Sequence, residues 1–296
     1  MSLKNLLKKL EAESISILRD SYSKSNNPVM MYSIGKDSSV LLHLVRKAFY
    51  PSPIPFPLLH IDTKWKFREM IKFRQKVQKK YKINLIVYTN KAGTNLHPQI
   101  DKNYTDIMKT KALKDALNKY QFDIIYGGAR RDEEASRSKE RVVSIREKGH
   151  LWNPKNQKPE IWNLFNYEKS DDQTLRVFPL SNWTELDIWN YIFQEKIEIV
   201  NLYFSKKRKC IKRDESYFLI DDKRFKINKG EKILNESIRF RTLGCYPLTA
   251  GIKSTAHTLR DIIRETQKQK FSERSGRLID FDKFNSMESK KREGYF

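Results

Sequence analysis

The sequence predicts an α/β fold with a doubly wound, mostly parallel sheet. Short apolar runs at 28–33, 58–62, 84–88 and 123–127 alternate with stretches of helical periodicity. Strands that alternate with helices of ten or more residues are typical of βαβ units and parallel sheets. The chain of 296 residues also has no run approaching the roughly 20 apolar residues that a membrane-spanning helix needs. We therefore expect a globular cytoplasmic protein.

The helices of the first half follow from the spacing of apolar side chains. Leu3, Leu6, Leu7 and Leu10 recur three and four positions apart, as on one face of an amphipathic helix. The proline-rich segment 51–57 separates a helix from the second strand. The helices predicted in this half cover residues 3–22, 40–49, 67–80 and 105–119.

The regularity weakens after Gly128. Thr184 is followed three residues later by Asp187, which resembles a capping box and predicts a helix that ends near Gln194. Further elements are predicted as a strand at 176–178, a hairpin arm at 216–220 and a helix at 255–269. We therefore expect a nucleotide-binding domain over residues 1–204 and a basic, less regular C-terminal region over residues 205–296.

The net charge favours certain kinds of partner, and the small number of cysteines excludes two kinds of structure. There are 59 Lys and Arg against 36 Asp and Glu, which gives +23. Such a charge suits phosphate-rich ligands, an acidic partner or nucleic acid, and it also fits a general drift toward lysine on the surface. The chain has only two cysteines, Cys210 and Cys245, so a disulfide framework and a CxxC metal site are excluded.

The strongest local signal lies between the first strand and the second helix. We call residues 33–39 the phosphate loop, and its sequence is Ser33-Ile34-Gly35-Lys36-Asp37-Ser38-Ser39. A glycine at this turn lets a ligand approach the backbone, and the amides at a helix N-terminus bind anions. The three serines add hydroxyl donors, Lys36 adds a cation, and Asp37 can hold Mg²⁺ on phosphate oxygens. A capped helix after a glycine turn is the simpler alternative for any single residue.

Two further segments follow the ends of strands. Asp62 ends the second strand, beside the phosphate loop, where it could contact ribose, adenine or a metal, or cap the next helix. The fourth strand ends in Gly127-Gly128, followed by arginines whose planar groups suit tetrahedral oxyanions. Arg130 and Arg131 are predicted to bind such an anion. A solvated charged helix is the alternative reading of the residues around Arg137.

The phosphate loop resembles the pyrophosphate-binding loop of the PP-loop nucleotide α-hydrolases, which attack the α-phosphorus of a nucleotide. Other strings, in order along nearly the whole chain, resemble one family within this group, the small subunits of two-subunit, GTP-dependent sulfate adenylyltransferases. These strings are LHIDTKWKF, TDIMKT, GGARRDEEASRSKERV, WNPKNQKPEIWNLFN, RVFPLSNWTELDIWNYI, RFRTLGCYPLT and SERSGRLIDFD. The chain departs from the family pattern at Lys64, Tyr104 and residues 250–254.

The resemblance implies transfer of AMP from ATP to sulfate, which gives adenylyl sulfate and pyrophosphate in sulfate assimilation. It also implies a larger GTPase subunit, whose GTP hydrolysis drives the reaction. The charge on the phosphates calls for Mg²⁺. We expect the C-terminal region, with Arg239 and Arg241, either to close the site or to meet the GTPase. We expect Lys36, Asp37, Arg130 and Arg131 to be the catalytic residues. The predicted nucleotide-binding residues are Ser33, Gly35, Lys36, Ser38, Ser39, Asp62, Gly127, Gly128, Asp132 and Arg137.

Sulfate is already ionised when it attacks, so this chemistry needs stabilised charge rather than a general base. The five histidines form no triad and no metal-binding pattern with the cysteines. A related reductase of adenylyl sulfate needs a nucleophilic cysteine near the C-terminus, and none follows Phe271. A tRNA-modifying PP-loop enzyme and a nucleic-acid-binding protein remain alternatives.

Overall fold

The computed structural model describes residues 2–162, 164–269, 273 and 292–294. Its main sheet has the strand order β3-β2-β1-β4-β6-β5. All neighbours pair in parallel except β5, which runs antiparallel to β6 at the edge. These strands are β1 (Pro28–Met31), β2 (Leu58–Ile61), β3 (Leu85–Tyr88), β4 (Ile124–Tyr126), β5 (Val143–Arg146) and β6 (Thr174–Val177). The predicted doubly wound, mostly parallel sheet is confirmed.

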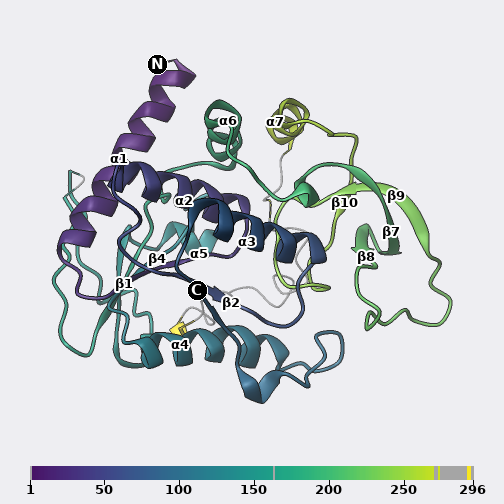
Figure 1. Cartoon of the computed structure of the whole chain (residues 1–296), viewed down its shortest axis with the longest axis horizontal. Helices are drawn as coiled ribbons and strands as arrows, with labels where there is room; N and C mark the ends of the chain where they lie inside the picture. The colour runs from purple at the N-terminus through teal and green to yellow at the C-terminus, as the bar shows by residue number, and fades with distance from the viewer. Residues whose placement is uncertain (1, 163, 270–272, 274–291, 295–296) are drawn as a thin grey trace.

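Helices cover both faces of this sheet. Figure 1 shows α1, α2 and α3 on one side and α4 on the other. The helices are α1 (Leu3–Ser23), α2 (Lys36–Phe49), α3 (Arg68–Tyr81), α4 (Ala112–Tyr120), α5 (Ala135–Ser138), α6 (Glu185–Glu195) and α7 (Leu259–Lys268). In the described residues no helix is both long and apolar enough to span a membrane.

The alternation of side chains along each strand divides the core into two clusters. Val29 and Leu59 point to one face, where they pack against Leu113 and Leu117 of α4. Met30 and its neighbours on the other face join a larger cluster that includes α1, α2 and α3. Because successive strand residues face opposite sides, a sheet covered on both faces favours apolar residues on both, as in β1, β3 and β4.

The C-terminal region is more regular than expected. Strands β7 (Lys206–Arg213), β8 (Ser216–Leu219), β9 (Leu234–Arg239) and β10 (Ile252–Lys253) form a four-stranded antiparallel sheet. The predicted hairpin arm is confirmed as β8, which pairs with β7. The basic run that begins at Lys206 lies in β7, where exposed lysines alternate with buried Arg208 and Cys210. Apolar residues of the C-terminal region, such as Ile211 and Phe240, join the larger core cluster.

One helix prediction and one alternative reading need correction. The segment 105–119 is not one α-helix, because residues Asp106–Lys111 form a π-helical turn, η2, before α4 begins. The charged segment after Gly128 is not one solvated helix, since α5 has only four residues and Arg137 is 6% exposed. The capping box is confirmed: Thr184 Oγ1 accepts from the Asp187 amide, and the Asp187 carboxylate accepts from the Thr184 amide.

Candidate active site

The phosphate loop connects the end of β1 to the start of α2. Gly35 is the N-cap residue of α2 and has no side chain that could cap this helix end. The Lys36 amide donates a hydrogen bond of 2.7 Å to the Tyr203 hydroxyl. The amides of Asp37 and Ser38 lie in the first turn of this helix of 14 residues. A helix N-terminus of this kind attracts anions through its amides and its dipole.

The serine hydroxyls of the phosphate loop have different surroundings. Ser38 Oγ and Ser39 Oγ both donate to the Gly35 carbonyl oxygen, at 3.0 and 2.9 Å. Ser33 Oγ donates to Ser38 Oγ at 3.2 Å. Ser33 and Ser38 line the cavity described below, whereas Ser39 lines another cavity, between α2 and α3. Of these three hydroxyls, only those of Ser33 and Ser38 are therefore placed to contact a ligand in the cavity beside α2.

Backbone geometry at the loop is strained at one residue and sterically tight at another. Ile34 is buried and has a left-handed φ of 69°, a conformation that costs on the order of 1–3 kcal/mol for a non-glycine residue. A Cβ at Gly128 would lie 3.2 Å from the Asp37 carbonyl carbon and 3.3 Å from the Ser38 amide nitrogen. At Gly35 a Cβ would make only ordinary contacts. The close approach of chain segments therefore requires glycine at 128 rather than at 35.

Lys36 is almost completely buried behind the helix N-terminus. Its ammonium group pairs with Asp37 Oδ2 at 3.2 Å and with the Glu273 carboxylate, and it lies 5.9 Å from the centre of the Trp189 ring. Burial by itself lowers the pKa of Lys36, but the carboxylates of Asp37 and Glu273 outweigh burial and hold this pKa above its ordinary value. Lys36 is therefore a permanent cation.

Arg130, also fully buried, is the second cation of this cluster. Its Nε lies 3.0 Å from Asp37 Oδ1, and its Nη2 lies 2.6 Å from Glu273 Oε1. Asp132 and Glu133 approach the same guanidinium at 3.3 and 3.9 Å. Two cations, Lys36 and Arg130, thus face four carboxylates, which leaves a formal charge of 2 − 4 = −2.

Three of these carboxylates could hold a cation. Oxygens of Asp37, Glu133 and Glu273 all lie within 4.8 Å of one another. Burial raises the pKa of Asp37, and Arg130 and Lys36 oppose the rise only in part, so its negative charge is incompletely compensated. Carboxylate oxygens are the protein ligands that Mg²⁺ prefers. The donor set and the excess negative charge both fit a magnesium ion.

A cavity of about 220 Å³ opens beside the start of α2, at the carboxyl ends of the parallel strands. The loops that follow β1 and β4 diverge here, because the strand order changes direction between these neighbours. Open α/β sheets bind ligands at such a switch point. The cavity is lined by Met31, Tyr32, Ser33, Asp37, Ser38, His60, Ile61, Lys66, Lys109, Gly128, Ala129, Glu133, Arg137, Leu243 and Gly244.

The structure brings five of the predicted site residues into this lining: Ser33, Asp37, Ser38, Gly128 and Arg137. Lys36 and Arg130 lie directly behind Asp37 and contact its carboxylate.

Other predicted residues lie outside the lining. Asp62 accepts from the Lys64 amide at 2.9 Å and pairs with Arg74 at 3.5 Å. Arg131 turns away from the cavity, toward Asn182 at 2.7 Å and Glu160 at 3.3 Å. Gly35, Ser39, Gly127 and Asp132 are likewise absent from the lining of this cavity. The ligand roles assigned to all of these residues stay predictions.

Sequence reasoning missed several lining residues, above all His60, Lys66 and Lys109. Lys66 had a usable signal, since it follows the end of β2 by five residues. Lys109 lies in the string TDIMKT, which resembles the family, but it was given no role because the turn that carries it was predicted as an ordinary helix. Glu133 belongs to the predicted glycine–arginine segment but was not assigned a role.

His60 is a buried, uncharged group of this cavity. Its Nδ1–H donates to the Tyr32 carbonyl oxygen, at 2.7 Å. Burial first, and then the Lys66 ammonium, lower the pKa of His60 to about 3. A histidine with so low a pKa is a weak base near neutral pH, which agrees with the expectation that the chemistry needs no histidine base.

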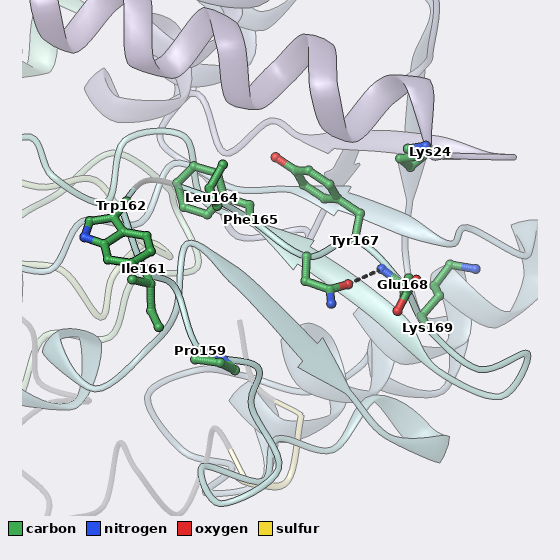
Figure 2. A pocket seen from close by; sticks show the side chains of 10 residues that line it. Lys24, Pro159, Ile161, Trp162, Leu164, Phe165, Tyr167, Glu168 and Lys169 are labelled. Carbon is green, nitrogen blue, oxygen red and sulfur yellow. Dashed lines mark hydrogen bonds between the residues drawn. The ribbon is translucent and has the colours of Figure 1, made fainter.

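A second cavity, of about 770 Å³, has a different character. Figure 2 shows Ile161, Trp162, Leu164 and Phe165 around it, with the Glu168 amide donating to Asn166. Trp162 is 89% exposed. The lining is largely aliphatic and aromatic, and it lacks the helix N-terminus and the buried cations found beside α2. We therefore place the candidate active site at the smaller cavity.

Comparison with known proteins gives matches over nearly the whole chain. The family model described as phosphoadenosine phosphosulfate reductase domain matches residues 27–251. The chain is 58% identical over 294 residues to sulfate adenylyltransferase subunit 2 of Aliivibrio fischeri, which covers 98% of this chain and 97% of the relative. The same protein of Vibrio cholerae matches with the same identity and coverage.

Among solved structures, FMN adenylyltransferase of Candida glabrata in complex with ATP has a TM-score of 0.53 at 15% identity. The match covers 94% of this chain and 89% of that chain. At this identity the likeness concerns the fold alone.

Proposed function

Because the chain belongs to the family of sulfate adenylyltransferase subunit 2, we propose that it transfers the adenylyl group of ATP to sulfate. An oxygen of sulfate attacks the α-phosphorus, the bond from that phosphorus to the bridging oxygen of pyrophosphate breaks, and adenylyl sulfate and pyrophosphate leave. The observation that carries this proposal is the phosphate loop at the switch point of the sheet, with Lys36 and Arg130 buried behind it.

The leaving pyrophosphate would lie at the N-terminus of α2. The amides of Asp37 and Ser38 and the hydroxyls of Ser33 and Ser38 are the donors available there. Because Lys36 and Arg130 are buried and permanently charged, they stabilise the charge that develops on pyrophosphate without reorganising.

Magnesium would be held by Asp37, Glu133 and Glu273. When bound, Mg²⁺ supplies the positive charge that neutralises phosphate oxygens. Without a bound metal ion, the formal charge of −2 on this cluster of Lys36, Arg130 and four carboxylates would repel ATP. The chain's own residues therefore make binding of the polyphosphate depend on a divalent ion.

The relatives' name, subunit 2, indicates an enzyme of more than one subunit. We propose that the partner is a larger GTPase subunit, which binds GTP and whose hydrolysis of GTP drives the otherwise unfavourable reaction. The cytoplasm, where ATP and GTP are both available, is the compartment proposed for the pair. Arg239 and Arg241, suggested by the sequence for this contact, are buried, paired with Glu265 and Glu185. Exposed residues of the C-terminal region are thus better candidates for contacting the partner.

Reduction of adenylyl sulfate is less well supported. Cys245 is 1% exposed, and its thiol donates to the Thr63 hydroxyl oxygen at 3.4 Å. Cys210 is completely buried in β7. A nucleophile that must reach a substrate and then a reducing partner needs to be accessible.

The test is formation of labelled adenylyl sulfate from ATP, Mg²⁺ and radioactive sulfate, with pyrophosphatase present. The chain is assayed alone and with the candidate GTPase subunit and GTP. Product that rises with the partner and GTP supports both the transfer and its coupling. Absence of product in every mixture, with consumption of adenylyl sulfate when thioredoxin is added, would replace the proposal by the reductase.

A further inference from the structure

The cations that reach the candidate active site are not equally available to a ligand. Arg137 pairs with Glu133, Glu134 and Glu140, at distances of 3.4–4.0 Å. Lys66, in contrast, has no carboxylate oxygen within 4.0 Å in the described part of the chain, although it lines the cavity. Within the described residues, the charge of Lys66 is therefore not neutralised at short range.

Lys109 adds a second positive charge at the same place. It also lines the cavity, and its positive charge acts on the Cys245 thiol. Burial alone raises the pKa of the Cys245 thiol, but Lys109 and Lys66 outweigh burial and lower this pKa. Burial, and then repulsion by Lys109, lower the pKa of Lys66 in spite of the opposing effect of Cys245. Two ammonium groups that repel each other beside one cavity would both be stabilised by a dianion bound between them.

The backbone supports this placement of Lys109. It lies in η2, a π-helical turn, and such turns often mark functional sites. The turn packs tightly, because a Cβ at Gly93 would lie 2.3 Å from Met108 Sδ. The buried Met108 thus anchors the turn, while the next residue, Lys109, lines the cavity.

We propose that Lys66 and Lys109 bind the sulfate that attacks ATP. This inference rests on the proposed function, since it assigns the second substrate of that reaction. Sulfate is a compact dianion, and two ammonium groups match its charge. Both lysines belong to segments other than the phosphate loop. The two anions of the reaction thus have separate cations: Lys36 and Arg130 for the polyphosphate, and the lysine pair for sulfate.

The test replaces each lysine by methionine, which keeps the length of the side chain and removes its charge. Lys64→Met is the matched control for Lys66, and Lys111→Met is the matched control for Lys109. Each control lysine is exposed, lies two residues from its target and is outside the cavity lining. We expect Lys66→Met and Lys109→Met to raise the KM for sulfate about ten- to a hundredfold, as for lost charge-assisted hydrogen bonds. The KM for ATP should change less than twofold, and both controls should behave as wild type. Arginine at either position should restore part of the affinity.

An unchanged KM for sulfate, or an equal rise in the KM for ATP, would overturn the assignment while the reaction itself stands. Calorimetric titration of the chain with sodium sulfate, in the presence of a non-hydrolysable ATP analogue, separates the two proposals further. If wild type forms no adenylyl sulfate but binds sulfate with an affinity that both lysine variants lose, the anion site stands and the proposed reaction fails.

Discussion

Replacement of Asp37 by asparagine separates the chemical role of this carboxylate from its role in folding. Asp37 lines the cavity, contacts Lys36 at 3.2 Å and Arg130 at 3.0 Å, and belongs to the three carboxylates that could hold a cation. Asparagine has nearly the same shape without the negative charge. The substitution should therefore weaken metal and pyrophosphate binding while it leaves the packing intact.

The effect on stability follows from the direction of the pKa shift. Burial raises the pKa of Asp37 above its ordinary value of 3.8. The native state thus holds its proton more tightly than the unfolded state, and ionisation above the raised pKa costs stability. At pH 7 the neutral asparagine should therefore not destabilise the fold, and we expect a change within about 1 kcal/mol, or less than about 4 °C in Tm. Turnover should fall about a hundred- to a thousandfold, as when a stabilising group is removed from a transition state.

The assay is the formation of labelled adenylyl sulfate, measured beside thermal unfolding of the same samples. Asp221→Asn is the control, because burial also raises the pKa of Asp221 while its carboxylate accepts from the Arg68 amide, outside the cavity. The control should keep wild-type turnover. A wild-type rate in Asp37→Asn would refute the metal and pyrophosphate role, and a loss of more than about 3 kcal/mol in stability would show that the carboxylate mainly holds the fold.

Three further predictions test other features of the site. Glu133→Gln should raise the Mg²⁺ concentration for half-maximal activity about tenfold, since it removes one of the three carboxylates proposed to hold the metal. A metal titration of turnover that matches wild type would contradict this. Gly128→Ala should cut turnover at least tenfold, because its Cβ would push against the backbone of Asp37 and Ser38; the expected structural sign is a lower Tm, and an unchanged Tm and rate would show that the contact can relax. The pKa of His60 is lowered to about 3 in the folded protein. As pH falls below about 6.5, His60 is therefore protonated in the unfolded state before it is protonated in the folded state. The free energy of unfolding should consequently decrease from pH 6.5 toward pH 4. Denaturant unfolding of His60→Gln should show a flatter profile over this range, and an identical slope would count against a neutral, buried His60.

Local sequence patterns predicted most of the main sheet, because apolar runs and helix caps depend on residues that are close together in the chain. Four apolar runs appeared as β1 to β4, and the capping box at Thr184 begins α6. The edge strand β5 was missed because it follows a charged segment and its pairing with β6 depends on residues about thirty positions away. Strand β7 was missed for a similar reason, since its alternation of lysines with buried residues has meaning only against a partner strand.

The sequence by itself determined the class of fold and the position of the phosphate loop, because strand alternation and a helix N-terminus after a strand are properties of neighbouring residues. Only the tertiary structure decided which charges are available to a ligand. Glu273 meets Lys36 across 237 positions of the chain, and it also pairs with Arg130. Arg131, adjacent in sequence, pairs with Glu160 outside the cavity, whereas Lys66 reaches the cavity without a carboxylate within 4.0 Å in the described residues. The formal charges of these cations are the same, but electrostatic energy depends on distance and on burial, and both are set by the packing of segments that are remote in sequence.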